Sequence, residues 1–191
     1  MLIEDLLGTH TPLASHEKYL LKANCSQFIE EAASNPLFKS LPTSYQDVQR
    51  VKARLQKKKT ELTEVYNKAF NHSNIRQRAV FAYAIPPALL EDTDTFYVFP
   101  VNGYKYLYCK EVTDSNSDYK RVVDTLFEQF NDTEKATEII TDLLKYTYLT
   151  ENLRDGIVAK AEIILYNIPQ YYAVRVNANK EYAELLAHIT K

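Results

Sequence analysis

Residues 96–112 read FYVFPVNGYKYLYCKEV, and this stretch decides the class of fold. Aromatic and branched side chains alternate along Phe96–Val101 and again along Tyr104–Val112, a pattern typical of β-strands. Asn102 and Gly103 stand between the two runs, and both residue types tolerate positive φ. The stretch therefore predicts two strands joined by a tight turn, as in a β-hairpin.

Further strands and helices are predicted on both sides of this stretch. Strands are expected at Ala79–Ala84, at Ala161–Ile168 and at Tyr172–Val176, the last two joined by a turn at Pro169. Helices are expected, from apolar residues at three- and four-residue spacings, over residues 1–34, 43–71, 119–130, 134–148, 152–159 and 181–189. Strands and helices do not alternate regularly, so the expected class is α+β. We expect a helical N-terminal third, then a small, split, antiparallel-rich sheet with intervening helices.

The composition favours a globular protein and excludes several kinds of site. The chain has 191 residues, of which 46% are hydrophobic and 25% charged, so a single domain over 1–191 is expected, with a helical extension at 1–34 and an α+β core at 35–191. Only three glycines are present, which argues against a glycine-rich phosphate loop. Neither the two cysteines nor the four histidines have metal-ligand spacing, so no metal is expected. No apolar run suits a membrane span, and a cytoplasmic location is expected.

Charge is segregated along the chain. The net charge is -2, yet residues 35–80 contain 10 basic and 3 acidic side chains, a local +7, which leaves -9 for the remainder. Within this part Arg50, Arg54, Lys57 and Lys58 lie on a predicted helix and could bind nucleic-acid phosphates or an acidic partner. The charge is spread around the predicted helix, so a solvated helix face explains the same residues without any partner, and both interpretations stay open.

One carboxylate stands out. Glu162 is the second residue of AEIIL, an otherwise apolar predicted strand. A carboxylate is costly to bury unless it has a partner or a function. Either Glu162 is such a residue, or the strand begins one position later and the side chain lies at its solvated end.

Several stretches, taken in order over about residues 35–175, resemble a group of tailed-phage proteins with an ADP-ribosyltransferase-like fold. The stretches are Pro36-Leu37-Phe38-Lys39-Ser40, Arg50–Lys59, Arg76 to Phe81, Tyr97-Val98-Phe99-Pro100, Glu162-Ile163 and Tyr171-Tyr172-Ala173. The resemblance implies an enzyme that cleaves the nicotinamide–ribose bond of NAD and modifies a host macromolecule. It implies Glu162 as the catalytic carboxylate, Lys39 and Arg76 as contacts to the NAD phosphates, and Tyr83 as a ring that stacks on nicotinamide.

The chain also departs from the pattern of that group. Lys39 and Ser40 stand where the group has arginine and glycine, and Lys160 stands where arginine-directed transferases have a glutamate or glutamine. Lysine keeps the charge but loses the planar fork of arginine. Two alternatives therefore remain: a non-catalytic phage accessory or virion-associated binding protein, and a nucleic-acid binder that uses residues 50–59. A phage protein of either kind would act in the host cytoplasm or be carried in the virion.

Overall fold

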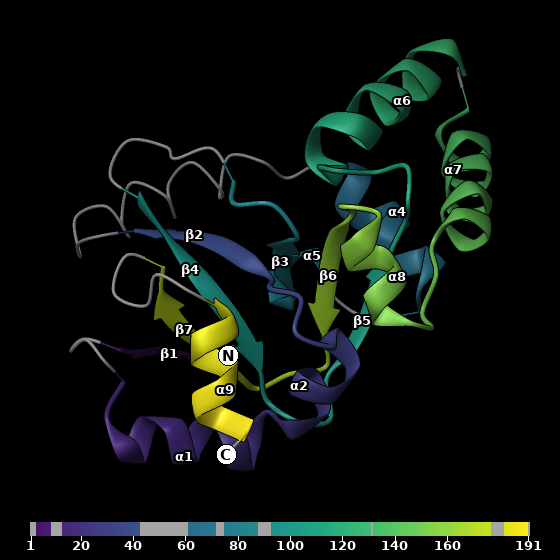
Figure 1. The fold of residues 1–191 in the computed structure, drawn as a ribbon. Coiled ribbons are helices and arrows are strands. Elements are labelled where there is room, and N and C mark those ends of the chain that lie inside the picture. Colours follow the sequence, from purple (N-terminus) through teal and green to yellow (C-terminus); the bar gives the residue numbers. More distant parts are fainter. Residues whose placement is uncertain are drawn as a thin grey trace.

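The computed structural model describes residues 3–8, 13–42, 61–71, 75–87, 93–130, 132–176 and 182–190, and shows a mixed α/β fold built on one sheet (Figure 1). The strands are β1 (Ile3–Leu7), β2 (Phe38–Pro42), β3 (Val80–Tyr83), β4 (Thr93–Pro100), β5 (Lys105–Tyr108), β6 (Glu162–Tyr166) and β7 (Gln170–Arg175). The helices are α1 (Ser15–Asn24), α2 (Ser26–Ala32), α4 (Glu61–Ala69), α5 (Ile75–Arg78), α6 (Ser115–Gln129), α7 (Thr133–Thr147), α8 (Leu153–Val158) and α9 (Tyr182–Thr190).

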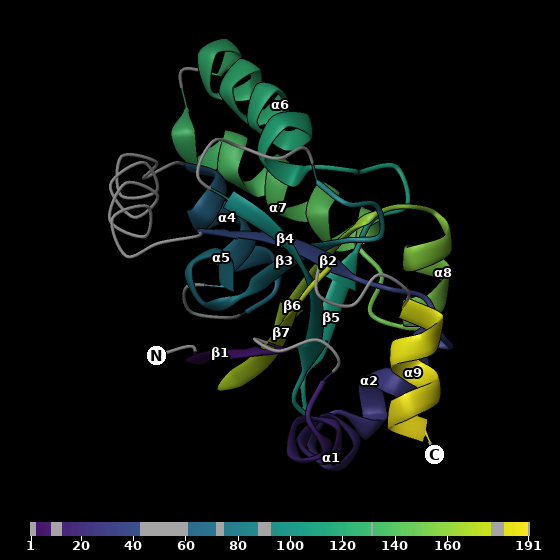
Figure 2. The same ribbon diagram turned by 60° about the vertical axis from the view of Figure 1, so that its left-hand side comes forward.

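The sheet narrows near its middle. Its strand order is β1-β7-β4-β2-β3-β6-β5, with β1 parallel to β7 and the other neighbours antiparallel. Strands β2 and β3 share the single paired position Phe38↔Tyr83, whereas β2 and β4 share five. The sheet therefore consists of a four-stranded and a three-stranded part joined by this one pair, and Figure 2 shows the same strands from a second direction. We call the pairing of β2 with β3 the junction.

The prediction of a hairpin at residues 96–112 is wrong, because the two strands do not pair with each other, although the chain does turn at Asn102-Gly103. Strand β4 pairs with β2 and β7, and β5 pairs with β6, so the strands on either side of the turn lie in different parts of the sheet. The turn instead docks on the first helices: the backbone N–H of Asn102 donates to Asn24 O at 2.7 Å, and that of Gly103 donates to Gln27 Oε1 at 2.8 Å. Gly103 has a φ of 90°, as a turn of this kind requires.

The expected helical N-terminal third is also wrong in part. Residues 3–7 form strand β1, which pairs with β7 near the other end of the chain, and residues 38–42 form β2. Neither strand could be read from local pattern, because a partner distant in the sequence decides strand formation. Helices α1 and α2 lie inside the predicted segment. The three- and four-residue spacing in this segment predicts one apolar face formed by Leu21, Cys25, Phe28, Ile29 and Ala32. All of these are fully buried except Ile29, which is partly buried.

The later helices lie close to their predicted positions. Helix α7 begins after Asp132, whose side chain accepts hydrogen bonds from the backbone N–H groups of Glu134 and Lys135 at 3.0 and 3.2 Å. Such a cap satisfies donors that the helix itself cannot. Of the predicted segment 43–71, residues 61–69 form α4, and residues 43–60 lie outside the described part of the chain.

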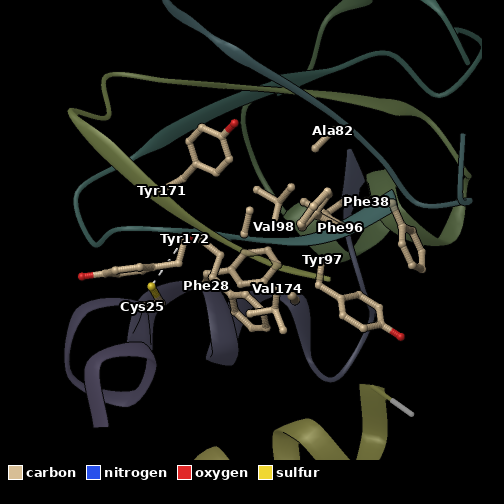
Figure 3. Packing of buried hydrophobic residues seen from close by; sticks show 14 of the residues in the cluster. Cys25, Phe28, Phe38, Ala82, Phe96, Tyr97, Val98, Tyr171, Tyr172 and Val174 are labelled. Carbon is tan, nitrogen blue, oxygen red and sulfur yellow. Dashed lines mark hydrogen bonds between the residues drawn. The ribbon is translucent and has the colours of Figure 1, made fainter. Parts of the chain in front are cut away.

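Two hydrophobic clusters cover the sheet. The larger one joins α1, α2 and α9 to β4 and β7, and Figure 3 shows part of it around Phe28 and Val98. The smaller one joins α4, α6 and α7 to β5 and β6. Neighbouring residues of β6 belong to different clusters, because side chains alternate between the faces of a strand: Ile163 and Leu165 to the larger, Ile164 to the smaller.

Gly156 on α8 is in close contact with two core side chains. A Cβ there would lie 2.7 Å from Tyr108 Cγ and 2.9 Å from Ile163 Cδ1. The Tyr108 ring cannot easily move away, because its hydroxyl donates to the carbonyl oxygens of Glu151 and Asn152. Alanine is favoured over glycine in a helix by about 1 kcal/mol. Overpacking costs about 1–3 kcal/mol, so we expect Gly156→Ala to lower the free energy of unfolding, measured by urea denaturation.

The control for this prediction is Val158→Ala on the same helix. The Val158 side chain is 65% exposed, so its truncation should change the free energy of unfolding by less than about 0.5 kcal/mol. A Gly156→Ala protein as stable as the wild type would show that α8 can shift away from β6.

Candidate functional site

Glu162 is the first residue of β6 and is buried, with 2% of its surface exposed. The alternative that the strand begins after it, with the side chain in solvent, is therefore wrong. Glu162 is two residues from Ile164 and so lies on the face of β6 that packs against α4, α6 and α7. The chain thus places a carboxylate beside the smaller hydrophobic cluster.

The two oxygens of the Glu162 carboxylate differ in their surroundings. Oε2 accepts a hydrogen bond of 3.1 Å from the backbone N–H of Ser115, the first residue of α6. The start of a helix carries free N–H groups and a partial positive charge, both of which favour an anion. Oε1 accepts no hydrogen bond from any residue in the described ranges, and it is shielded from solvent. A buried acceptor without a partner destabilises the fold by about 1–3 kcal/mol.

Arg76 is held beside this carboxylate. Its Nη1 donates to Ser115 Oγ at 2.9 Å, and its guanidinium carbon lies 4.9 Å from the centre of the Tyr66 ring and 5.0 Å from that of Phe81. The negative ring faces attract the cation. The backbone N–H and the hydroxyl of Ser115 therefore connect Glu162 to Arg76.

The electrostatic effects on Glu162 oppose one another. Burial raises the pKa of its carboxyl group, because the charged form loses its hydration. The hydrogen bonds from Ser115 and the positive charge of Arg76 lower the pKa, and the nearby charge of Asp114 raises it. Burial is the largest of these effects, so the pKa lies above its ordinary value. Such a carboxyl group at a polar site is a candidate for chemistry as well as for structure.

Tyr83 lies directly opposite Glu162 in the sheet, since the two residues pair across β3 and β6. Directly paired residues project to the same face. Burial raises the pKa of the Tyr83 phenol, and the negative charge of Glu162 raises it further. Tyr83 therefore stays protonated next to the carboxylate, and its hydroxyl remains a hydrogen-bond donor.

Lys39 lies on β2, one position beyond Phe38 and the junction, and is half-buried. Burial lowers the pKa of its ammonium group, while the charges of Glu4 and Glu162 raise it. The influence of Glu162 places Lys39 within electrostatic range of the carboxylate. The structure thus brings Glu162, Arg76 and Tyr83 together, and Lys39 lies on the adjoining strand β2, one position beyond the partner of Tyr83. We call these four side chains, which the resemblance predicts as site residues, the junction site.

Several other residues that contact or surround the junction site were not expected from the sequence. Ser115 contacts two residues of the junction site, and Glu4 acts on Lys39 from β1. The hydroxyls of Tyr66 and Tyr148 are hydrogen-bonded to each other, and the Arg76 guanidinium lies over the Tyr66 ring. None of these residues carries a local sequence signal, apart from the high tyrosine content of the chain, 15 of 191 residues.

The remaining sequence predictions concern other parts of the chain. Arg50, Arg54, Lys57 and Lys58 lie outside the described residues. Within the described ranges, no three His, Cys, Asp or Glu side chains gather in a way that could hold a metal ion. In the same ranges no helix has both the length and the apolar character needed to cross a membrane.

Comparison with known proteins gives no match: no protein-family model, no curated protein and no solved structure is significantly similar to this chain.

Proposed function

We propose that the chain is an ADP-ribosyltransferase-like protein that binds NAD at the junction site and transfers ADP-ribose to a host macromolecule. The observation that supports this most is the buried carboxylate of Glu162, with one oxygen held by Ser115 and the other without a hydrogen-bond partner. A costly, incompletely paired carboxylate beside two basic residues and a tyrosine is typical of a site that completes its contacts when a ligand binds.

The proposed reaction breaks the bond between the ribose C1′ and the nicotinamide nitrogen. The bonding electrons leave with nicotinamide, and an acceptor X–H attacks C1′ and loses its proton. NAD and the acceptor thus give ADP-ribosyl-X, nicotinamide and a proton. Positive charge develops on the ribose in this step, and a fixed carboxylate stabilises such charge, as at glycosidic bonds. Glu162 supplies that carboxylate.

The other members of the junction site have roles that fit the same ligand. Lys39 supplies a positive charge for the phosphates, as a point charge rather than the bidentate fork of an arginine. Tyr83 supplies an aromatic ring and a protonated hydroxyl next to Glu162. Because the charge of Glu4 also acts on Lys39, a phosphate bound there competes with this carboxylate.

Thermal unfolding with and without NAD tests the proposal. A ligand that binds only the folded state stabilises it by about 2.7 kcal/mol at 100 times its dissociation constant. We expect NAD at millimolar concentration to raise the midpoint of the wild type by several degrees and to leave that of Lys39→Gln unchanged. Lys105→Gln is the matched control, because Lys105 is exposed on β5, away from the junction, and its loss should leave the NAD effect intact.

The absence of any NAD effect on the wild type would contradict NAD binding. The chain would then be better regarded as a non-catalytic binding protein on this fold, and its partner would be sought by co-purification. An equal loss of the effect in Lys39→Gln and Lys105→Gln would show that NAD binds through general charge rather than at the junction site.

A further inference from the structure

The Arg76 side chain is already occupied by contacts inside the protein. One of its nitrogens donates to Ser115 Oγ at 2.9 Å, and the guanidinium lies near the rings of Tyr66 and Phe81, at 4.9 and 5.0 Å. Ser115 is itself fully buried. A cation enclosed in this way has a fixed position before any ligand arrives, which is more typical of a supporting residue than of a mobile phosphate contact.

Ser115 binds both neighbours through different groups. Its hydroxyl accepts from Arg76, while its backbone N–H donates to Glu162 Oε2. Fixing Ser115 through its side chain therefore also fixes the N–H group that holds the carboxylate. Oε2 is held, whereas the buried Oε1 has no hydrogen-bond partner among the residues that the structure describes.

We propose that Arg76 and Ser115 are positioning residues: they orient the Glu162 carboxylate through Oε2 and favour its charged form, so that Oε1 is the oxygen left to contact the ribose when the substrate binds. The inference rests on the proposed function for the identity of the substrate. The effect of Arg76 and Ser115 on Glu162 can be tested without any substrate. The positioning role and the proposed function can therefore fail independently of each other.

The charge state of Glu162 depends on every titratable group packed around it. Arg76 favours the ionised carboxylate and Asp114 opposes it. Tyr66, Tyr83 and Tyr148 keep their protons, because burial raises the pKa of each phenol. Among the described residues, the titratable groups that interact electrostatically with Glu162 are Arg76 on α5, Asp114 next to α6, Tyr83 on β3, Tyr66 on α4, Lys39 on β2 and Tyr148 after α7.

The test follows the titration of Glu162 by NMR, using protein labelled with ¹³C at the glutamate carboxyl groups. The Glu162 signal is assigned by its loss in Glu162→Gln. We expect Arg76→Gln to move the titration midpoint of Glu162 to higher pH, since a favourable positive charge is removed. Arg76→Lys, which keeps the charge, should return the midpoint towards that of the wild type. Arg78→Gln is the matched control, because Arg78 is exposed on the same helix and its loss should not move the midpoint.

The second measurement is the rate of NAD cleavage by the same variants. A lost positioning contact should lower kcat on the order of 10- to 100-fold in Arg76→Gln and change KM little, as expected when an interaction matters mainly in the transition state. Arg78→Gln should keep both constants. If the wild type cleaves no NAD but Arg76→Gln moves the Glu162 midpoint, the positioning stands and the proposed function fails.

An unchanged Glu162 midpoint in Arg76→Gln overturns the inference, whatever the outcome with NAD. If circular dichroism shows that Arg76→Gln does not fold, the Glu162 midpoint is measured in Ser115→Ala instead. This variant keeps the backbone N–H that binds Glu162 and removes the hydroxyl, which accepts from Arg76 and itself lowers the pKa of Glu162. A smaller shift of the midpoint in the same direction supports the positioning role, and no shift overturns it.

Discussion

Under the proposed function, Glu162→Gln is expected to lower NAD cleavage strongly and, in the same protein, to raise the stability of the fold. Glutamine keeps the shape of the side chain and its acceptor for the Ser115 N–H, but it cannot stabilise positive charge on a ribose. Removing a group that stabilises the transition state electrostatically lowers kcat about 10²- to 10³-fold. Steady-state release of nicotinamide measures this loss.

The gain in stability has a separate cause. The buried carboxylate of Glu162 loses its hydration, and its Oε1 has no partner among the described residues. A neutral amide avoids most of the cost of burying a charge. Replacing a residue that serves function rather than stability commonly adds on the order of 1 kcal/mol, or about 2–4 °C in the midpoint for a chain of this size.

This gain should depend on pH. The pKa of Glu162 is raised in the folded protein, so the folded state binds the proton more tightly than the unfolded state. The wild type therefore has its full stability below the ordinary pKa of a glutamate and loses part of it as the pH rises through the folded-state pKa. The advantage of Glu162→Gln should be small in acid and grow with rising pH.

Glu134→Gln is the matched control for both readings, because Glu134 is exposed in the first turn of α7 and remote from the junction. It should keep full NAD cleavage and gain no stability. A Glu162→Gln protein that still released nicotinamide at the wild-type rate would show that another group supplies the chemistry.

Phe99→Ala is expected to cause the largest loss of stability. Phe99 is fully buried in the larger cluster on β4, a strand with neighbours on both sides. Its ring meets that of Phe28 edge-on at 5.8 Å and stacks on that of Tyr182 at 6.1 Å. Truncation of such a ring costs about 3–5 kcal/mol, a large part of the about 5–15 kcal/mol by which a typical domain is stable.

Urea unfolding followed by circular dichroism measures this loss, with Tyr146→Ala as the control. Tyr146 is 88% exposed on α7, and its truncation should change the free energy of unfolding by less than about 0.5 kcal/mol. Similar losses in the two variants would mean that the contacts of Phe28 and Tyr182 with Phe99 contribute little to holding α2 and α9 on the sheet.

The predictability of the fold differed between its elements. Helices α6, α7 and α9 were predicted because amphipathic spacing is a local property, which does not depend on distant partners. Strands β1 and β2 were missed, and β4 and β5 were assigned to a hairpin, because pairing joins residues far apart in the sequence, as in Ile3↔Gln170. A turn signal such as Asn102-Gly103 predicts where the chain reverses and does not predict which strands pair.

The sequence by itself determined which residues carry charge into apolar surroundings. Glu162 stood out because AEIIL is apolar around it, and Lys39, Arg76 and Tyr83 followed from an ordered resemblance. Only the tertiary structure decided that Tyr83 and Arg76 lie beside Glu162. The antiparallel register of β3 and β6 sets Tyr83 opposite Glu162, and the start of α6 brings Ser115 to the carboxylate. The physical reason is that burial and hydrogen bonding, which set the charge state of Glu162, depend on neighbours in space rather than in the chain.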